Sequence, residues 1–291
     1  EGVSVTSHNG TISLSGTGNN KNKNNSLSNV TVNSADGDIT LQAAKGSVQL
    51  KGSKVDGKPT VSVTADKGNI TINGNGGNSV GVYFQNTNLS AGNMTVTGST
   101  TGGASNSYSP FGGIHIYGKA DFHVKEGGKG IITGTAVNKN NYYAAGIEIG
   151  RLWDGGTEVL FDGDFDIKGK ATGSSEKNVV GGIFFDELST NITMTRGNIT
   201  LSADGYEGAS GITGMNSDYS SANSRRFNLQ NNAKLIINAS SDSGTAFSSI
   251  GTGDSPTFSY GFVFSGQGDV EINAHSNSSS EALYVNNFNN T

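Results

Sequence analysis

The chain has 291 residues and a formal net charge of -5 at pH 7; 33% of its residues are hydrophobic, 44 are glycine and none is cysteine. The acidic balance argues against a nucleic-acid or anionic-membrane partner, because both are bound by clustered Lys and Arg. Without cysteine there is no disulfide framework and no thiolate metal site. Charged residues make up only 15% of the chain. A disordered chain of this polarity would carry more charge, so the abundant Asn, Ser, Thr and Gly indicate stacked turns instead.

The N-terminal sequence EGVSVTSHNG has neither the basic start nor the apolar run of a signal peptide. No segment approaches the ~18 uninterrupted apolar residues of a membrane span. The chain opens and closes within its repeating pattern, so we expect it to be an internal piece of a longer protein.

Between residues 29 and 75 the chain alternates apolar and polar residues in short segments separated by turn residues. Val30 and Val32 in NVTVN, and Ile70 and Ile72 in NITING, show the pattern. Such alternation places one face of a strand in the core and the other in water. A hairpin meander would give the same pattern, but a steady step of about ten residues without two-residue Asn-Gly loops favours successive sides of a coil.

From Gly81 onward a glycine followed by alternating apolar residues returns five times, as GVYF, GIHI, GIEI, GIFF and GFVF at Gly81, Gly113, Gly146, Gly182 and Gly261. A strand that recurs about every 30 residues is typical of a solenoid, in which each repeat buries its apolar face by stacking on the next. The intervals are unequal, and the longest polar excursions, such as SDYSSANSRR, interrupt the later repeats. Insertions of this kind map to loops over one face, often the binding face.

These patterns predict an all-β chain folded as a right-handed parallel β-helix with about three strands per coil. The predicted organisation is one continuous solenoid, with a short-rung segment over residues 1–79 and a longer-rung segment with loop excursions over residues 80–291. Helices are not expected, because β-branched residues and glycine dominate and a glycine inside a helix costs about 1 kcal/mol relative to alanine.

The phrases GDITL, GNITING, GNMTVTG, GNITLSADG and GDVEINA, together with the Asn-rich turns, resemble the filamentous-haemagglutinin-like exoproteins of bacterial two-partner secretion, particularly the HMW-type adhesins. The resemblance covers most of the chain and consists of repeat style. It implies secretion to the bacterial cell surface through an outer-membrane transporter partner, and sugars on asparagine added by a cytoplasmic N-glycosyltransferase. The NPNL and NPNG elements of the family's secretion domain do not occur, so the resemblance implies an interior segment of such a protein.

Eleven N-x-S/T sequons occur in the chain. A chain this rich in Asn, Ser and Thr produces most such motifs by chance, and the resemblance is what makes some of them glycosylation candidates. The candidates are Asn29, Asn69, Asn88, Asn93, Asn191, Asn198, Asn238 and Asn277. Five of these precede an apolar-Thr pair at the start of a strand and are therefore expected to be exposed at a corner: Asn29, Asn69, Asn93, Asn191 and Asn198.

Asp162, Asp164 and Asp166 in FDGDFDI have the spacing of a calcium loop. The sixth position is Ile167 rather than Gly, and no Glu stands at the twelfth, so the EF-hand interpretation fails. Alternating positions of one strand would place the three carboxylates on a single outer face. We expect a solvated face there, and the sequence predicts neither a metal nor a cofactor.

No catalytic residue is predicted, although parallel β-helices also host polysaccharide lyases and glycosidases. A hydrolase needs two carboxylates about 5–10 Å apart on a groove. The candidates are Asp154, Glu158, Asp186 and Glu187. His115 and His123 fall at polar positions of alternating strands and are expected to be surface residues. No GxSxG, HExxH or P-loop string occurs, so the chain is not expected to be an enzyme.

Aromatic residues in the excursions are the candidate ligand-binding residues. Flat apolar rings beside hydrogen-bonding groups suit a sugar ring or a protein partner, although the same rings could fold back to seal the core. The predicted site is Trp153 with Tyr142, Tyr143, Arg151 and Asp154, because their loops leave consecutive coils and could converge.

The sequence therefore predicts a non-enzymatic adhesin segment, secreted or on the bacterial surface, whose rigid rod presents loops to a host glycan or protein receptor. Two alternatives remain open. One is a passive structural spacer of a large exoprotein, and the other is a polysaccharide lyase or glycoside hydrolase.

Overall fold

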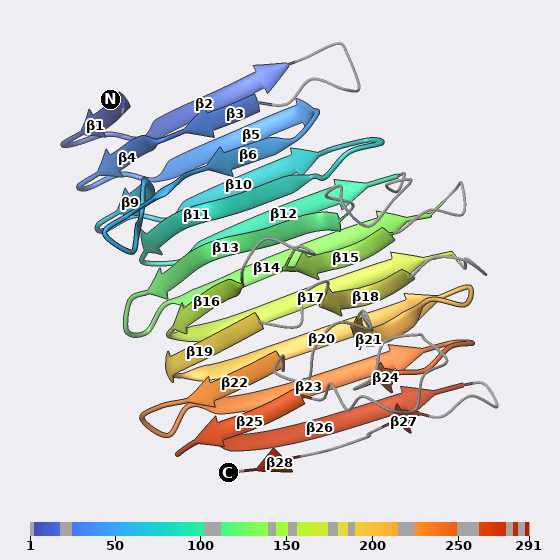
Figure 1. The fold of residues 1–291 in the computed structure, drawn as a ribbon. Coiled ribbons are helices and arrows are strands. Elements are labelled where there is room, and N and C mark those ends of the chain that lie inside the picture. Colours follow the sequence, from blue (N-terminus) through green and yellow to red (C-terminus); the bar gives the residue numbers. More distant parts are fainter. Residues whose placement is uncertain are drawn as a thin grey trace.

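The computed structural model describes residues 3–17, 25–101, 112–138, 144–150, 156–173, 180–185, 190–214, 225–248, 262–277, 282–284 and 289–290. Within these ranges the chain is all-β, without a helix. It winds into a right-handed parallel β-helix, and coil follows coil from one end of the stack to the other (Figure 1). The predicted fold class is confirmed.

Each coil passes through three strand positions, which form three columns along the stack. Column 1 contains β3 (Asn25–Ser28), β6 (Val48–Lys51), β15 (Ala144–Ile149), β18 (Val180–Phe185), β21 (Ser210–Gly214), β24 (Phe247–Ser248) and β27 (Leu283–Tyr284). Column 2 contains β1 (Val3–Ser7), β4 (Val30–Ser34), β9 (Val61–Ala65), β16 (Thr157–Asp162), β19 (Thr190–Arg196), β22 (Arg225–Leu229), β25 (Phe262–Gly266) and β28 (Asn289–Asn290).

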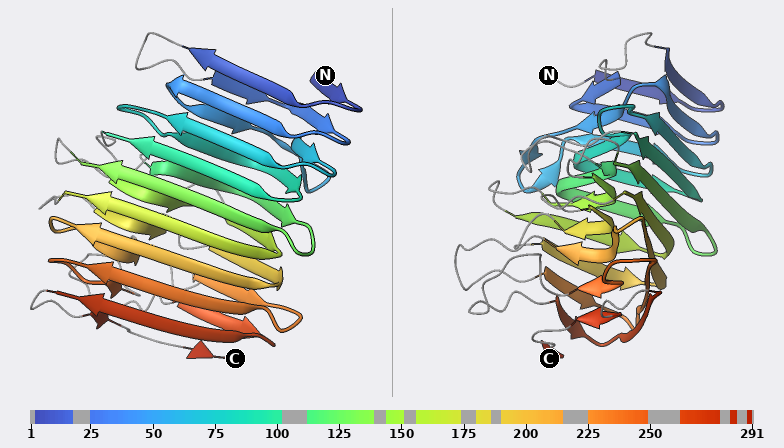
Figure 2. Two further views of the ribbon diagram at one scale, coloured as in Figure 1. Left: turned by 180° about the vertical axis from the view of Figure 1, so that it is seen from behind. Right: turned by 90° about the vertical axis from the view of Figure 1, so that its right-hand side faces the viewer.

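Two long strands, β11 (Val82–Ala91) and β13 (Gly112–Val124), run through columns 1 and 2 and join them into one 17-stranded sheet. Column 3 is a separate nine-stranded sheet on the opposite side of the stack (Figure 2). It contains β2 (Ile12–Thr17), β5 (Ile39–Lys45), β10 (Ile70–Asn75), β12 (Met94–Thr100), β14 (Lys129–Val137), β17 (Asp164–Thr172), β20 (Asn198–Tyr206), β23 (Lys234–Ser241) and β26 (Asp269–Ser276).

The core is a set of stacked inward-facing side chains between the two sheets. Ile39, Ile70 and Met94 lie at one register position of column 3 and are fully buried. The same alternation along each strand sends the intervening Thr and Asn side chains to the outer face. The phrases GDITL, GNITING, GNMTVTG, GNITLSADG and GDVEINA all mark this position, where the chain enters column 3.

Coil length changes along the stack. At this register position, neighbouring coils from Ile12 to Met94 are 27, 31 and 24 residues apart. From Met94 to Val270 the separation is 34 to 36 residues. The proposed division at residue 79 stays a prediction, since the hydrogen-bonded columns run past it without interruption.

The returning glycine marks the narrow end of the coil, where column 3 leads into column 1. A Cβ on Gly134 would lie 2.1 Å from the carbonyl oxygen of Gly146, so only glycine lets the two backbones approach this closely. The phrases at Gly81, Gly113, Gly146 and Gly182 share this position. The fifth phrase does not, because it forms β25 in column 2.

A small hairpin interrupts the coil between β6 and β9. It consists of β7 (Lys54–Val55) and β8 (Lys58–Pro59), the two antiparallel strands of the described chain. Asp56 and Gly57 form its turn with φ values of 49° and 73°. Positive φ at both positions is what a two-residue Asp-Gly loop supplies. The other strands between residues 29 and 75 are successive sides of the coil, as predicted.

Connections between columns follow one rule. The corner from column 2 to column 3 is always short, from the single residue Gly163 to the four residues 125–128. Long connections occur only at the two ends of column 1. They include residues 102–111 and 139–143, which lead into it, and residues 215–224 and 249–261, which lead out of it.

Candidate functional site

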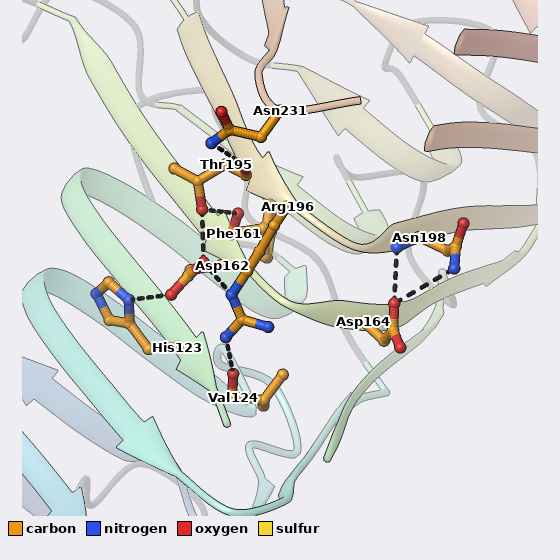
Figure 3. Close-up of polar contacts among 9 residues, drawn as sticks. All are labelled: His123, Val124, Phe161, Asp162, Asp164, Thr195, Arg196, Asn198 and Asn231. Carbon is orange, nitrogen blue, oxygen red and sulfur yellow. Dashed lines mark hydrogen bonds and ion pairs between the residues drawn. The ribbon is translucent and has the colours of Figure 1, made fainter. Parts of the chain in front are cut away.

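The described structure offers three groups of side chains to weigh as a functional site: a charged cluster at the corner between columns 2 and 3, an amide ladder beside it, and a buried row on the outer face of column 1. The charged cluster is centred on Asp162, the last residue of β16 (Figure 3). His123 Nδ1 lies 3.4 Å from Asp162 Oδ2. The Thr195 hydroxyl donates to Asp162 Oδ1 at 2.6 Å, and Arg196 Nε lies 2.8 Å from the same oxygen.

A β-bulge brings both Thr195 and Arg196 to this one carboxylate. Phe161 pairs with Met194, but Asp162 pairs with Arg196, so Thr195 is the extra residue. Arg196 Nη2 also donates to the carbonyl oxygen of Val124 at 2.5 Å. The guanidinium therefore links three successive coils, those of β13, β16 and β19.

The two carboxylates of this face have pKa values shifted in opposite directions. Burial alone would raise the pKa of Asp162, but the hydrogen bonds from Thr195 and His123 and the charge of Arg196 outweigh it and hold the pKa below its ordinary value. Asp121 lies on the neighbouring strand, and burial raises its pKa in spite of the opposing charges of Lys119 and His123. Asp162 is thus a tightly held structural anion rather than an available base.

The amide ladder begins where the chain enters column 3. Asp38 Oδ1 accepts the backbone N–H of Asn69 at 2.7 Å, and Asn93 Nδ2 donates to Asn69 Oδ1 at 2.9 Å. Further along, Asp164 Oδ1 accepts the backbone N–H of Asn198 at 2.7 Å (Figure 3). Each contact joins one coil to the next, so these side chains stabilise the stacking of coils.

The three aspartates of FDGDFDI do not share a strand face, contrary to the prediction. Gly163, with φ of 120°, turns the chain between Asp162 and Asp164, so the first carboxylate ends column 2 and the second begins column 3. Each has its own partner, and that of Asp166 is Lys129 at 2.7 Å. Across the described ranges, no group of three His, Cys, Asp or Glu side chains is placed to hold a metal ion.

The sequon asparagines lie in different environments. Asn29, Asn69, Asn93, Asn191 and Asn198 are exposed, as expected for corner positions. Asn277 is also exposed, after the end of β26. Asn88 and Asn238 are half-buried, and the Oδ1 atom of Asn88 is buried without a hydrogen-bond partner.

The outer face of column 1 carries a buried row of side chains that the sequence analysis did not anticipate. His115 and Glu148 occupy neighbouring register positions and are 0% and 1% exposed. His115 Nε2 lies 2.7 Å from the carbonyl oxygen of Gly150, and Nδ1 lies 3.5 Å from Glu148 Oε2. The Tyr83 ring lies edge-on to His115 at 5.1 Å.

The surface prediction is therefore wrong for His115, whereas His123 is 35% exposed. Alternation sends the His115 side chain outward as predicted, but the outer face of column 1 is covered. Phe184 continues the row and is fully buried.

The predicted ligand-binding residues lie outside the described residues. Tyr142 and Tyr143 belong to the connection before β15; Arg151, Trp153 and Asp154 belong to the connection after it. The two connections therefore join opposite ends of the same six-residue strand. Among the enzyme candidates, Glu158 is exposed on column 2, while Asp154, Asp186 and Glu187 also fall outside the described ranges.

Comparison with protein-family models, with curated proteins and with solved structures found no match. In the part of the chain that the structure describes, no helix is long and apolar enough to cross a membrane.

Proposed function

We propose that this chain is a rod segment of a secreted or surface-attached bacterial adhesin, and that its binding side is the side of column 1. The observation that supports this assignment is the placement of the long connections. They join the two ends of column 1, while the corner between columns 2 and 3 is closed in every coil by one to four residues. A spacer has no need to gather its insertions on one side, whereas a binding surface does.

The rod itself supports the same proposal. Parallel register holds each coil against its neighbours over nine strands of column 3, and interior side chains from Ile39 to Phe264 are buried. A stiff scaffold of this kind keeps the connections at fixed spacing, which lowers the ordering cost of binding. The proposed receptor is a host glycan or a host protein.

Residues of two connections provide the test. We expect alanine substitution of Tyr142, Tyr143 and Trp153 together to weaken binding to host cells or to an immobilised glycan array at least about tenfold, the loss of one or two aromatic anchors. The matched control replaces Thr71, Thr97 and Thr133 on the outer face of column 3 with alanine and should bind like the unmodified chain. Equal binding by both variants would remove the predicted site.

The two rival functions give different results in the same experiments. A passive spacer would show no binding to cells or to any glycan on the array. A polysaccharide lyase or hydrolase would release new reducing ends from a polysaccharide; the carboxylate pair that such chemistry needs is not supplied by Asp162, which is held by Thr195 and Arg196.

Secretion through an outer-membrane transporter partner and modification by a cytoplasmic N-glycosyltransferase belong to the same proposal. The intact mass of the chain, after co-expression with such a transferase, measures how many sequons are occupied. We expect sugar on the exposed Asn69, Asn93 and Asn198, which lie where the chain enters column 3, and none on the half-buried Asn88. An unmodified mass would contradict this part of the proposal.

A further inference from the structure

The end of β15 is tied to the preceding coil through both backbone polar groups of one residue. Gly150 follows β15 directly and has a φ of 97°, so the chain changes direction there. Its N–H donates to the carbonyl oxygen of Ile116 at 2.9 Å, and its own carbonyl oxygen lies 2.7 Å from Nε2 of His115. The imidazole of His115 therefore anchors the point at which the chain leaves β15.

The contact with Gly150 fixes the first proton of this imidazole. A carbonyl oxygen can only accept a hydrogen bond, so Nε2 of His115 carries a hydrogen and donates it. In a neutral imidazole the other ring nitrogen, Nδ1, then has a lone pair and acts as an acceptor.

Nδ1 faces a second group that accepts when it is ionised. Glu148 Oε2 lies 3.5 Å from Nδ1 of His115, and the two side chains are 1% and 0% exposed. A neutral imidazole beside an ionised carboxylate would bring two lone pairs together and would bury a net negative charge, which is costly away from water. One further proton, on Nδ1 or on the carboxyl group, makes the contact attractive and leaves the pair with no net charge.

The described surroundings of the pair are aromatic. The Tyr83 ring on β11 lies edge-on at 5.1 Å from the His115 ring, and the Tyr117 ring, on the same strand as His115, lies at 6.3 Å. These two tyrosines are the titratable groups that face the pair from the described strands, and the Lys51 ammonium on β6 lies 5.5 Å from the centroid of the Tyr83 ring. A tyrosine hydroxyl is ordinarily uncharged near neutral pH, so within these strands the ionisation that matters is that of His115 and Glu148 themselves.

The pair is confined to one coil of the buried row. The neighbouring coils carry, at the same register position, residues that ordinarily neither gain nor lose a proton near neutral pH. They are Gln49, Tyr83, Phe184 and Thr213, and all are as deeply buried as the pair or nearly so. Burial of the row therefore does not require titratable side chains, and a buried ionisable pair is a poor way to gain stability alone.

We infer that His115 and Glu148 share one buried proton and form a pH-dependent clasp on the end of β15, strongest in mildly acidic solution. Above the ordinary pKa of histidine, about 6.5, the unfolded chain releases a proton that the folded pair keeps, so stability falls as pH rises. Below the ordinary pKa of glutamate, about 4.3, the unfolded chain takes up a second proton that the folded pair excludes, so stability falls as pH falls. The inference does not rest on the adhesin assignment, because it concerns a proton and the stability of one turn.

The position of the proton can be measured by NMR on the whole chain, with 15N in the histidine rings and 13C in the glutamate carboxyl groups. His115→Gln and Glu148→Gln assign the two signals by their loss. Near neutral pH we expect either both ring nitrogens of His115 protonated beside an ionised Glu148, or Nε2 alone protonated beside an uncharged Glu148 carboxyl group. Protonation of Nε2 alone beside an ionised Glu148 would overturn the inference, and it needs no variant to fold.

The second test is the pH dependence of the protection factor of the Gly150 N–H, whose exchange requires its bond to Ile116 to open. In the unmodified chain the protection factor should fall by up to about tenfold for each pH unit above about 6.5. Glu148→Gln keeps the shape of the side chain and places an amide donor against Nδ1, so the folded imidazole stays neutral. In that variant the protection factor should instead fall as pH drops below about 6.5.

Glu126→Gln provides the matched control, because Glu126 is an exposed glutamate in the turn between β13 and β14. It should follow the unmodified chain at every pH. The same pH slope in the unmodified chain and in Glu148→Gln would contradict the shared proton, and so would a control that behaves like Glu148→Gln. Neither measurement involves binding to cells or glycans, so failure of the clasp and failure of the adhesin proposal are distinguished.

Discussion

The early coils, residues 25–100, and the late coils, residues 112–277, hold the same three-column register with different chemistry. In the early coils the core is largely aliphatic, as with Leu50 and Val63. In the late coils phenylalanine rings stack from coil to coil, with Phe122 5.3 Å from Phe161 and Phe227 5.2 Å from Phe264. Phe161 also lies 5.1 Å from Phe165 within its own coil. The late coils also have longer column 3 strands, nine residues in β14 and β17 against six in β10. A wider coil needs larger side chains to fill it.

The early and late coils also differ in the side chains of their outer faces. On the outer face of column 2 the early coils carry uncharged, half-buried pairs such as Ser62 and Thr64, at the register positions that Asp121 and His123 occupy in the late coils. Parallel stacking therefore tolerates either hydroxyl rows or compensated charges on its surface. The repeat therefore preserves the backbone register and not a particular side-chain chemistry.

The largest effect should come from the late core. Phe161→Ala removes a ring that contacts both Phe122 and Phe165 and should lower the free energy of unfolding by about 3–5 kcal/mol, whereas Val63→Ala in the early core should cost about 2 kcal/mol. Each loss should be local, because coils contact only their neighbours. Peptide-resolved hydrogen exchange measures both the size and the position of the effect. Uniform loss of protection along the chain in either variant would mean that the stack unfolds as one unit.

The next effect concerns the ion pairs of the two regions. Arg196→Leu leaves the half-buried Asp162 without its cation and the Val124 carbonyl without its donor, so we expect a loss of about 2 kcal/mol. The early pair, Lys67 with Asp36 at 2.7 Å, is largely exposed. Lys67→Gln should leave the urea midpoint unchanged, because water screens a pair this exposed. Urea denaturation of the two variants compares them directly, and equal losses would show that the bulge contributes nothing to the late pair.

Much of the fold was predictable from sequence, because alternation and a repeating glycine phrase report directly on register. The phrases GNITING and GNMTVTG predicted exposed asparagines at a corner, and Asn69 and Asn93 are exposed there. The burial of His115 could not be predicted in this way. Alternation gives the direction of a side chain but not what covers the face it points to, and the outer face of column 1 is the covered one.

The β-bulge at Thr195 could not be predicted from the sequence either, for a different reason. The segment NITMTRGNITL reads as two alternating strands around a glycine, and nothing in it shows that Asp162 on the preceding coil pairs with Arg196 rather than Thr195. The contact depends on residues 34 positions apart, which meet only once the coil length is fixed. The candidate site could therefore be drawn from sequence as a set of exposed residues but not as a connected cluster.

The two carboxylates of the late outer face should respond to pH with opposite signs. The pKa of Asp162 lies below its ordinary 3.8, so its contribution is fully present above that pH and is lost as pH falls through the folded value. The pKa of Asp121 lies above 3.8, so its ionisation costs stability as pH rises through its folded value. At neutral pH, Asp162→Asn should destabilise the chain and Asp121→Asn should stabilise it, each by about 1 kcal/mol or less for partly exposed groups.

The check is the urea midpoint of both variants and the unmodified chain across acidic to neutral pH. Both differences should shrink on acidification, because protonated Asp and Asn then resemble one another. Ser62 occupies the register position of Asp121 two coils earlier and provides the early-coil control. Ser62→Asn introduces no titratable group and should give a difference that does not vary with pH. A shift of the same sign for Asp121→Asn and Asp162→Asn would contradict the opposed environments.

The smallest effect belongs to the amide ladder of the early coils. Asn69→Ala removes the donor to Asp38 and the acceptor for Asn93 but keeps the backbone N–H bond to Asp38. Because all three side chains are exposed, water replaces what is lost, and the expected cost is about 0.5 kcal/mol. Asn198→Ala, at the same register position in the late coils, loses only the 3.5 Å contact to Asp164 and should cost less. Thermal unfolding measures both losses of stability. A larger loss for Asn198→Ala than for Asn69→Ala would contradict this prediction, because the amide ladder would then contribute more in the late coils, where charged side chains already link the coils.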